Sequence, residues 1–336
     1  MRFYKFLISW EASGAVGSGP ETSLRIGEVT YDSDHGTYQF QEGKPPLYST
    51  HGPASMLVVG DRILVCWRMN DKIAWGYYNT KSVTQNKNFT YVDAWSCIGR
   101  SPPRLFRDTG GRILAMYDCS GSIRQMSFDP HTLHRESSGQ CATQGLSHTS
   151  NYRPAPFTLQ SSNWLAWHGS GGNVCAGRFS GNDKGLFTNL SGKGPHVTST
   201  GVQELTGLKP LFTVTALMTG SNVTLIYPDA SSAALQSNIQ VNTYTVTNGY
   251  ELKWIGGHSV GRVPGLSKPL YATDDLDLIH MGPHYFMALP DGNSGNGHAR
   301  IVKLSETDLK TVENHSDMGQ KVNPAYSGVQ LAALPG

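Results

Sequence analysis

The stretch Pro53-Ala-Ser-Met-Leu-Val-Val-Gly-Asp-Arg-Ile-Leu-Val-Cys-Trp67 decides the fold of this chain. It reads as a short apolar strand, a Gly-Asp turn and a second strand that ends in an aromatic residue. The same sequence pattern is repeated in Pro103-Arg-Leu-Phe-Arg-Asp-Thr-Gly-Gly-Arg-Ile-Leu-Ala-Met-Tyr117. Six copies open at Pro53, Pro103, Pro154, Pro210, Pro269 and Pro324, and subtraction of these numbers gives spacings of 50, 51, 56, 59 and 55 residues. A repeat of this length built from strands alone predicts a radial β architecture.

The repeat predicts an all-β fold, a six-bladed β-propeller with four antiparallel strands per blade. Its sixth copy is divided between the chain ends, because Pro324 opens it and residues 1–10, 24–31 and 37–41 supply the other three strands. We therefore expect N- and C-terminal strands to share one blade, which closes the ring and removes free sheet edges. The expected blades, within a single domain over 1–336, are 53–102, 103–153, 154–209, 210–268, 269–323, and 324–336 plus 1–52.

Composition narrows the classes of partner. The formal net charge is +2 and only 15% of the residues are charged, so we expect no nucleic-acid partner. No apolar run approaches about 20 residues, so we expect no membrane insertion. The apolar stretch at the start of the chain is too short for a recognisable signal peptide, which predicts a cytoplasmic or non-classically secreted protein. The sequence leaves a homo-oligomer open.

Two sets of side chains recur in phase with the repeat. In a propeller, the loop into the first strand of a blade and the loop after its second strand open on the same face. Basic or imidazole side chains precede the repeat prolines, at His51, Arg100, Arg153, Lys209, Lys268 and Lys321. Polar groups follow the strand-ending residues, in Trp10-Glu11, Trp67-Arg68, Tyr117-Asp118, Trp167-His168, Tyr227-Pro-Asp229 and Leu289-Pro-Asp291. We expect the two sets to converge on that face.

This combination of residue types suits sugar recognition. The face of an aromatic ring packs on the C–H patch of a sugar, and fixed donors and acceptors read its hydroxyl groups. The candidate ligand-binding residues are Trp67, Arg68, Arg100, Tyr117, Asp118, Arg153, Trp167, His168, Lys209 and Tyr227. The alternative for each aromatic residue is packing between adjacent blades without ligand contact. The alternative for each basic residue is a solvated rim charge or a bond to a neighbouring carbonyl group.

The turn Asp32-Ser-Asp34-His-Gly36 faintly resembles the Asp box of sialidase-type propellers and also a calcium-binding loop. Asx side chains that bond to their own turn explain the same pattern without a ligand. We therefore expect no cofactor and no metal, with Ca²⁺ at Asp32 and Asp34 as the weaker alternative.

Across nearly the whole chain, the repeat resembles the six- and seven-bladed β-propeller lectins of fungi and bacteria. Gly60-Asp-Arg-Ile-Leu-Val-Cys-Trp67-Arg68 with Trp75-Gly-Tyr-Tyr78 carries the resemblance, and Trp164-Leu-Ala-Trp167-His168-Gly169 carries it again. The resemblance implies a carbohydrate-binding lectin with multiple sites on one face, which binds carbohydrates or glycoconjugates without catalysis. The fourth and fifth blades depart from the pattern around 230–237 and 293–297, which puts their sites in doubt.

Two other classes of protein remain as alternatives. A glycoside hydrolase or lyase of the sialidase-like or arabinanase-like propeller type would hold paired carboxylates in one central site. Candidate catalytic residues for such an enzyme are Glu11, Asp118, Asp229 and Asp291. A protein-interaction propeller is the second alternative. An enzyme should carry one constellation that does not repeat, so the recurrence of polar groups favours the lectin.

Overall fold

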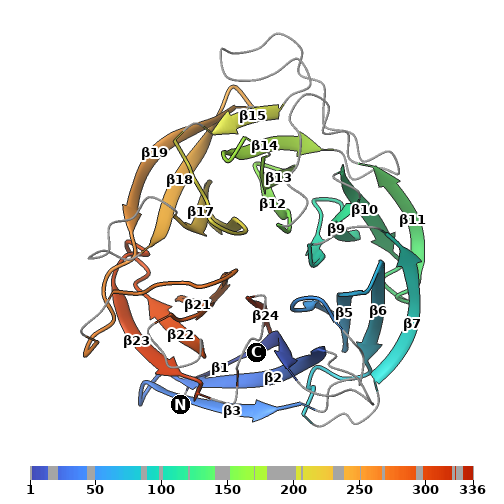
Figure 1. Ribbon diagram of the computed structural model, residues 1–336, viewed down its shortest axis with the longest axis horizontal. Coiled ribbons are helices and arrows are strands. Elements are labelled where there is room, and N and C mark those ends of the chain that lie inside the picture. The colour runs from blue at the N-terminus through green and yellow to red at the C-terminus, as the bar shows by residue number, and fades with distance from the viewer. Residues whose placement is uncertain are drawn as a thin grey trace. The chain divides into compact units, whose positions relative to one another are not determined.

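The computed structural model describes residues 2–13, 22–43, 50–84, 89–97, 101–119, 122–140, 152–169, 171–179, 202–205, 207–229, 238–249, 251–266, 269–292, 298–319, 322 and 328–335. Within these residues the strands form six four-stranded antiparallel sheets, and no α-helix is present. The chain therefore has the predicted all-β, six-bladed β-propeller fold, with one sheet per blade (Figure 1). No helix of the described residues has the length and apolar character of a transmembrane span.

The strands group into two compact units, and the first unit comprises Met1–Ser96, Ser232–Ile239 and Ser259–Gly336. It contains three of the sheets. Their strands, in sheet order, are β24 (Val329–Ala333), β1 (Phe3–Ser13), β2 (Thr22–Asp32) and β3 (Thr37–Glu42); β4 (Ser55–Val59), β5 (Arg62–Met69), β6 (Lys72–Tyr78) and β7 (Phe89–Ser96); and β20 (Asp277–Met281), β21 (His284–Pro290), β22 (Ala299–Leu304) and β23 (Val312–Asp317).

The second unit comprises Cys97–Ser231 and Gln240–His258. The strands of its three sheets are β8 (Arg104–Arg107), β9 (Ile113–Cys119), β10 (Ser122–Phe128) and β11 (Arg135–Gln140); β12 (Ala155–Leu159), β13 (Ser162–His168), β14 (Val174–Phe179) and β15 (Val202–Leu205); and β16 (Thr215–Thr219), β17 (Asn222–Pro228), β18 (Ile239–Thr247) and β19 (Glu251–Ser259). The strands of each sheet fall within one of the six ranges expected from the sequence. A single domain over the whole chain stays a prediction.

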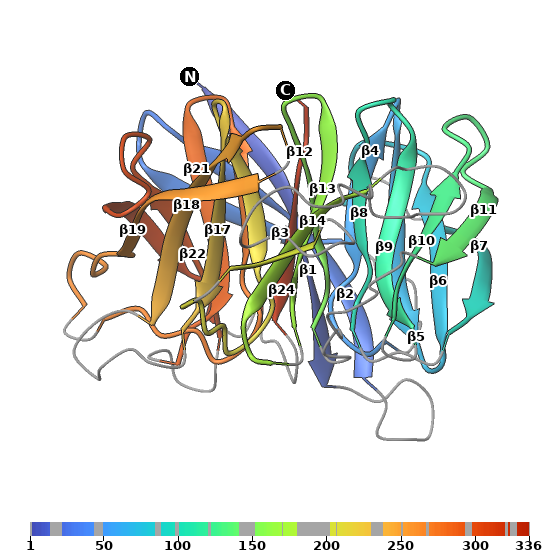
Figure 2. The ribbon, with the colours of Figure 1, turned by 90° about the horizontal axis from the view of Figure 1, so that it is seen from above.

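One blade is shared by the two ends of the chain, as the divided sixth copy predicts. The C-terminal strand β24 pairs antiparallel with β1, placing Trp10 opposite Val329 and Phe6 opposite Ala333. β1 then pairs with β2, and β2 with β3. Because β1 and β24 run in opposite directions, the labelled N- and C-terminal ends lie at the same end of this sheet (Figure 2).

The pattern of burial follows the place of a strand in its sheet. All seven residues of the second strand β9 are buried, whereas the fourth strand β3 is mostly exposed. A second strand packs against neighbouring blades on both faces, so it needs a continuous apolar run such as Ile113-Leu-Ala-Met-Tyr117. A fourth strand has one solvated side, which permits polar residues. The strand-ending aromatics of the repeat therefore fall in the most buried part of each sheet.

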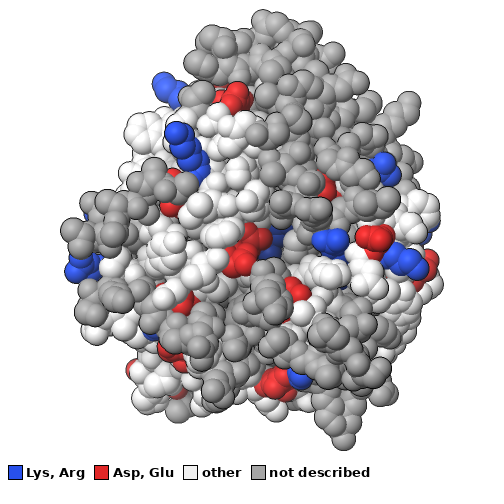
Figure 3. All heavy atoms as spheres, viewed as in Figure 1, with Lys and Arg blue, Asp and Glu red and all other residues white. Residues whose placement is uncertain are grey.

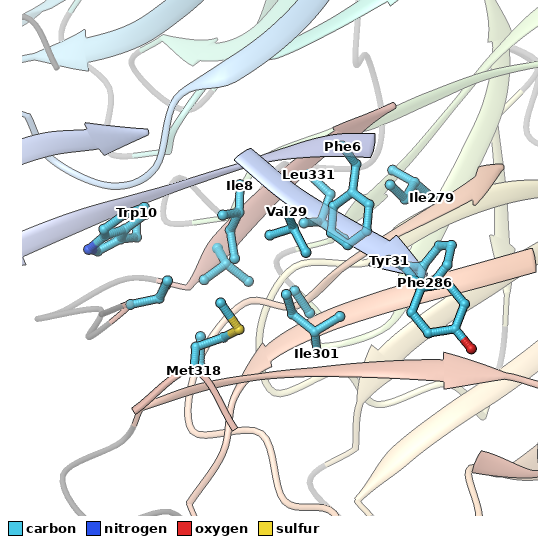
Figure 4. Close-up of a cluster of buried hydrophobic side chains, with 14 of the residues drawn as sticks. Phe6, Ile8, Trp10, Val29, Tyr31, Ile279, Phe286, Ile301, Met318 and Leu331 are labelled. Carbon is cyan, nitrogen blue, oxygen red and sulfur yellow. The ribbon is translucent and has the colours of Figure 1, made fainter. Parts of the chain in front are cut away.

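The blade that contains both chain ends packs against the blade of β20–β23 through a shared apolar cluster. Phe6, Ile8 and Trp10 come from β1, and Phe286 and Ile301 come from β21 and β22. Figure 4 shows these side chains pointing toward one another between the two sheets. The Phe6 and Phe286 rings stack with centroids 5.1 Å apart. Apolar burial of this kind, repeated between neighbouring blades, is the main stabilising contribution to the fold.

Candidate functional site

The two recurring sets of residues meet within individual blades. The backbone N–H of His51 donates to the carbonyl oxygen of Arg68 at 3.0 Å. Pro210 forms an isolated β-bridge with Asp229, and Ala272 forms one with Asp291. In each case the segment that precedes a first strand pairs with a residue at or just after the end of the second strand. Of these three contacts, the one between His51 and Arg68 joins members of the two recurring sets.

The four predicted aromatic residues are core residues in this structure. Trp67, Tyr117 and Trp167 are fully buried, and Tyr227 is only 2% exposed. The Trp67 ring packs edge-on against Phe89, with centroids 5.8 Å apart. That contact lies within one blade, but Trp67 also belongs to a buried cluster with Leu7 and Leu24 of the neighbouring blade, which is the inter-blade packing that the sequence left as the alternative. A sugar could stack on any of these rings only after the ring was uncovered.

The predicted polar residues differ in their exposure. Asp118 is fully buried, and Arg153 is 1% exposed. His168 is also buried and stacks on Tyr152, with ring centroids 4.5 Å apart. Arg68 is half-buried and its Nε donates to the Asn70 carbonyl, whereas Lys209 is exposed. The predicted residues Arg100, Lys268 and Lys321 lie outside the described residues.

Two carboxylates considered for the enzyme alternative are engaged in structural contacts. Glu11 is buried and its Oε2 accepts a hydrogen bond of 2.8 Å from the backbone N–H of Gly52. Asp291 is fully buried, and its Oδ2 lies 2.6 Å from Nε of Arg300. Arg300 in turn lies 3.1 Å from Nδ1 of His315. In the second unit, Asp118 is fully buried and Asp229 is half-buried.

The turn at Asp32 binds its own backbone. The Asp32 carboxylate accepts hydrogen bonds from the backbone N–H groups of Asp34 and His35, and it lies 2.7 Å from Nδ1 of His35. The hydrogen bond with His35 is the main cause that lowers the pKa of Asp32, and the same bond raises the pKa of His35. Among the described residues, no group of three or more His, Cys, Asp or Glu side chains could hold a metal ion. This geometry is that of an Asx turn.

A groove that the sequence did not point to lies between two blades of the second unit. It holds about 470 Å³ and is bounded by β15 on one side and by β18 and β19 on the other. These strands lie side by side in Figure 1. The side chain of Gln203 in β15 joins the two sides, because its amide donates to and accepts from the backbone of Leu252 in β19, each at 2.9 Å. The side-chain amide of Gln203 thus makes the two hydrogen bonds to Leu252 that the backbone of a paired strand would make, and it links the two blades.

A tryptophan stands at the edge of this groove. Trp254 is 57% exposed, and its Nε1–H donates to Oδ1 of Asn242 at 3.0 Å. The Nδ2 of Asn242 donates to the hydroxyl of Tyr227, also at 3.0 Å. Gly257 leaves room for this arrangement, since a Cβ atom there would collide with the Asn242 amide. One of the predicted ligand residues, Tyr227, therefore supports the indole from the core without facing solvent.

The polar groups around Trp254 carry both signs of charge. Glu204, Glu251 and Lys253 line the groove with Asn242. Nδ2 of Asn173 donates to the Glu204 carboxylate, which fixes one of its oxygens. In the view of Figure 3, blue and red side chains form small separate groups among uncharged residues. The groove therefore offers an aromatic face beside hydrogen-bonding groups, the combination that the sequence predicted at other positions.

No protein-family model and no curated protein matches this sequence. Solved structures do match. A protein from Lactobacillus plantarum is 14% identical, with a TM-score of 0.56 and coverage of 99% of this chain and 100% of that one. A variant of the Aleuria aurantia lectin in complex with Fucα1-6GlcNAc is 9% identical, with a TM-score of 0.52 and 96% of each chain covered. The periplasmic gluconolactonase of Pseudomonas aeruginosa is 13% identical, with a TM-score of 0.49 and coverage of 99% and 100%.

At these identities the likeness shows the fold alone. The fungal lectin is described as a six-bladed β-propeller, in agreement with the six sheets of this chain. The fold class is thus shared with the Aleuria aurantia lectin. Function has to be argued from the site itself.

Proposed function

We propose that this protein is a carbohydrate-binding lectin, and that the groove beside Trp254 is one of its sugar sites. The observation that carries the proposal is an indole that is more than half exposed and yet held in place by a hydrogen bond to Asn242. The exposed face of the indole offers a flat apolar surface on which the C–H patch of a sugar can stack. Its fixed orientation reduces the entropy lost when a sugar stacks on it.

The polar groups of the groove supply the second half of sugar recognition. The carboxylates of Glu204 and Glu251 accept hydrogen bonds from hydroxyl groups, and Lys253 donates to them. Two carboxylates against one ammonium group favour a neutral sugar or an amino sugar over an acidic one. The groove lies between the third and fourth blades, and Trp254 belongs to the fourth, where the departure from the repeat had put a site in doubt.

Further sites remain part of the proposal. His168 with Tyr152, Arg68 and Lys209 stand at repeat positions in other blades, and a lectin with several sites on one face would use them. The contributions of His168 and Arg68 are separable from that of Trp254, because neither lines the groove, whereas Lys209 follows directly on the groove residues Gly207 and Leu208.

A glycan array followed by titration calorimetry tests the proposal. The wild-type protein should bind a subset of neutral or amino-sugar glycans and should not turn over aryl glycosides. Trp254→Ala should weaken binding by at least about tenfold, equivalent to about 1.4 kcal/mol. Trp95→Ala is a matched control, because Trp95 is 37% exposed on the fourth strand β7 of another blade. Equal affinity of wild type and Trp254→Ala would exclude the groove, and an array without binding would exclude the lectin.

A further inference from the structure

A second pocket lies in the first unit, at the ends of three first strands. β24 contacts both β20 and β4, and the pocket opens at the hairpin turns after β4 and β20 and at the residues that follow β24. It holds about 730 Å³, within the range of roughly 300–1,000 Å³ that is usual for small-molecule sites. The larger part of its lining is apolar, from Leu57, Val58, Met281, Ala333, Leu334 and Pro335.

Two glycines shape the rim of this pocket. Gly60 and Gly282 occupy the hairpin turns after β4 and β20 with φ values of 62° and 57°, a backbone conformation that side-chain-bearing residues rarely adopt. A Cβ atom at Gly60 would meet no atom within 4 Å, so the rim is open there. Phe3 lines the same rim and is 49% exposed. An apolar hollow with an exposed aromatic at its edge offers burial to an apolar ligand.

The formal charge among the described residues that line the pocket is that of Lys5, which is positive. Lys5 and His280 line it, both are exposed, and none of the described residues that line it is acidic. The His280 ring is held against Tyr285, with centroids 4.4 Å apart. The backbone of Lys5 is fixed as well, because its carbonyl oxygen accepts a hydrogen bond from the N–H of Leu334. A basic group at the rim of an apolar pocket complements a ligand that is apolar at one end and anionic at the other.

We infer that this pocket binds a small amphipathic acid, with its apolar part against Leu57 and Met281 and its anionic group beside Lys5. The inference is independent of the lectin proposal, since none of these residues belongs to the Trp254 groove. It assigns the protein a second ligand of a different chemical class from a sugar.

Two fluorescent probes test the inference. Anilinonaphthalene sulfonate is an amphipathic anion, and phenylnaphthylamine has nearly the same rings without the sulfonate. The folded wild-type protein should bind one molecule of each, and decanoate should displace both. Lys5→Gln should weaken the sulfonate by about threefold or more and leave the neutral probe within about twofold. Lys253→Gln, an exposed lysine of the other groove, is the control and should change neither affinity.

Two variants address the pocket itself. Leu57→Glu places a carboxylate against the apolar wall and should weaken both probes by about tenfold or more. Because Leu57 is half-buried, Ala333→Glu serves as the second variant, since Ala333 is exposed and its replacement does not disturb the core. Circular dichroism establishes that each variant is folded. Unchanged binding of both probes to folded Ala333→Glu and Leu57→Glu overturns the site. Equal weakening of both probes by Lys5→Gln overturns the assignment of an anion.

Discussion

Replacing Gln203 with alanine should lower the free energy of unfolding by about 2–4 kcal/mol. Gln203 is 7% exposed, and Leu252, to which its side chain makes two hydrogen bonds, is 2% exposed. The alanine variant leaves one buried N–H and one buried carbonyl group of Leu252 without their partner. Each loss costs about 1–3 kcal/mol. The adjacent groove admits water to this position, which keeps the total in the lower part of the summed range.

The variant Gln203→Glu tests the same contact through pH. The introduced carboxylate can accept from the Leu252 N–H but cannot donate to the carbonyl group, so burial and repulsion raise its pKa above the usual value of about 4.3. The folded protein then holds this proton more tightly than the unfolded chain does. Stability of the variant therefore rises as pH falls through the raised pKa, and it reaches its full value below about pH 4.3.

Urea denaturation followed by tryptophan fluorescence measures both effects. Gln39→Ala is the matched control, because Gln39 is an exposed glutamine in the fourth strand β3, and it should change stability by no more than about 0.5 kcal/mol. A Gln203→Ala variant as stable as this control would refute the reasoning. So would a Gln203→Glu variant whose stability relative to wild type did not change between pH 4 and pH 7, the window in which a raised pKa must act.

Three further predictions concern other parts of the chain. Arg300→Met should destabilise the protein by about 3–5 kcal/mol in denaturant titration, because it removes the guanidinium 2.6 Å from the fully buried Asp291 carboxylate; equal stability would show that the pair contributes nothing. The pKa of Asp32 is lowered from 3.8 and that of His35 is raised from 6.5, so their pairing is lost as pH falls through the first pKa and as pH rises through the second. The difference in Tm between wild type and Asp32→Asn should accordingly be largest between those two pKa values, and a difference independent of pH would contradict this. Burial raises the pKa of the Cys66 and Cys97 thiols, and it raises the pKa of Cys175 to about 12. A Cys141→Ser protein should therefore react with dithiobis-nitrobenzoate only as fast as it unfolds, and rapid reaction of the native protein would count against this.

The candidate site was predictable only in part. The chain segments that carry the recurring positions pair with each other in some blades, as the bridges at Asp229 and Asp291 show, whereas the convergence of the two predicted sets of side chains stays a prediction. The sugar-stacking role predicted for the recurring aromatic residues does not follow from their recurrence, because the same recurrence arises when an aromatic residue packs between blades. Trp67 and Trp167 recur in phase for that structural reason and are fully buried. A single sequence cannot separate these two causes of a repeated aromatic residue.

Trp254 was missed for the opposite reason. It lies in β19, a fourth strand in one of the two blades whose sequences depart from the repeat, so no periodic signal marks it. Its role depends on Asn242, Gln203 and Glu204, which come from other strands. The residues that form the groove are up to 51 positions apart, by subtraction of 203 from 254. Only folding brings them together.

The sequence by itself determined the six-bladed fold, the four strands of each blade and the blade shared by the chain ends. It could do so because proline, turn and apolar strand recur at nearly constant spacing, and every strand pair except β24 with β1 is local in the chain. The tertiary structure alone decided which side chains face solvent. Blades pack face to face, so the aromatic residues that recur most regularly are buried in the core. The groove beside Trp254 arises where non-equivalent strands of neighbouring blades meet, and the apolar pocket arises at the ends of three first strands.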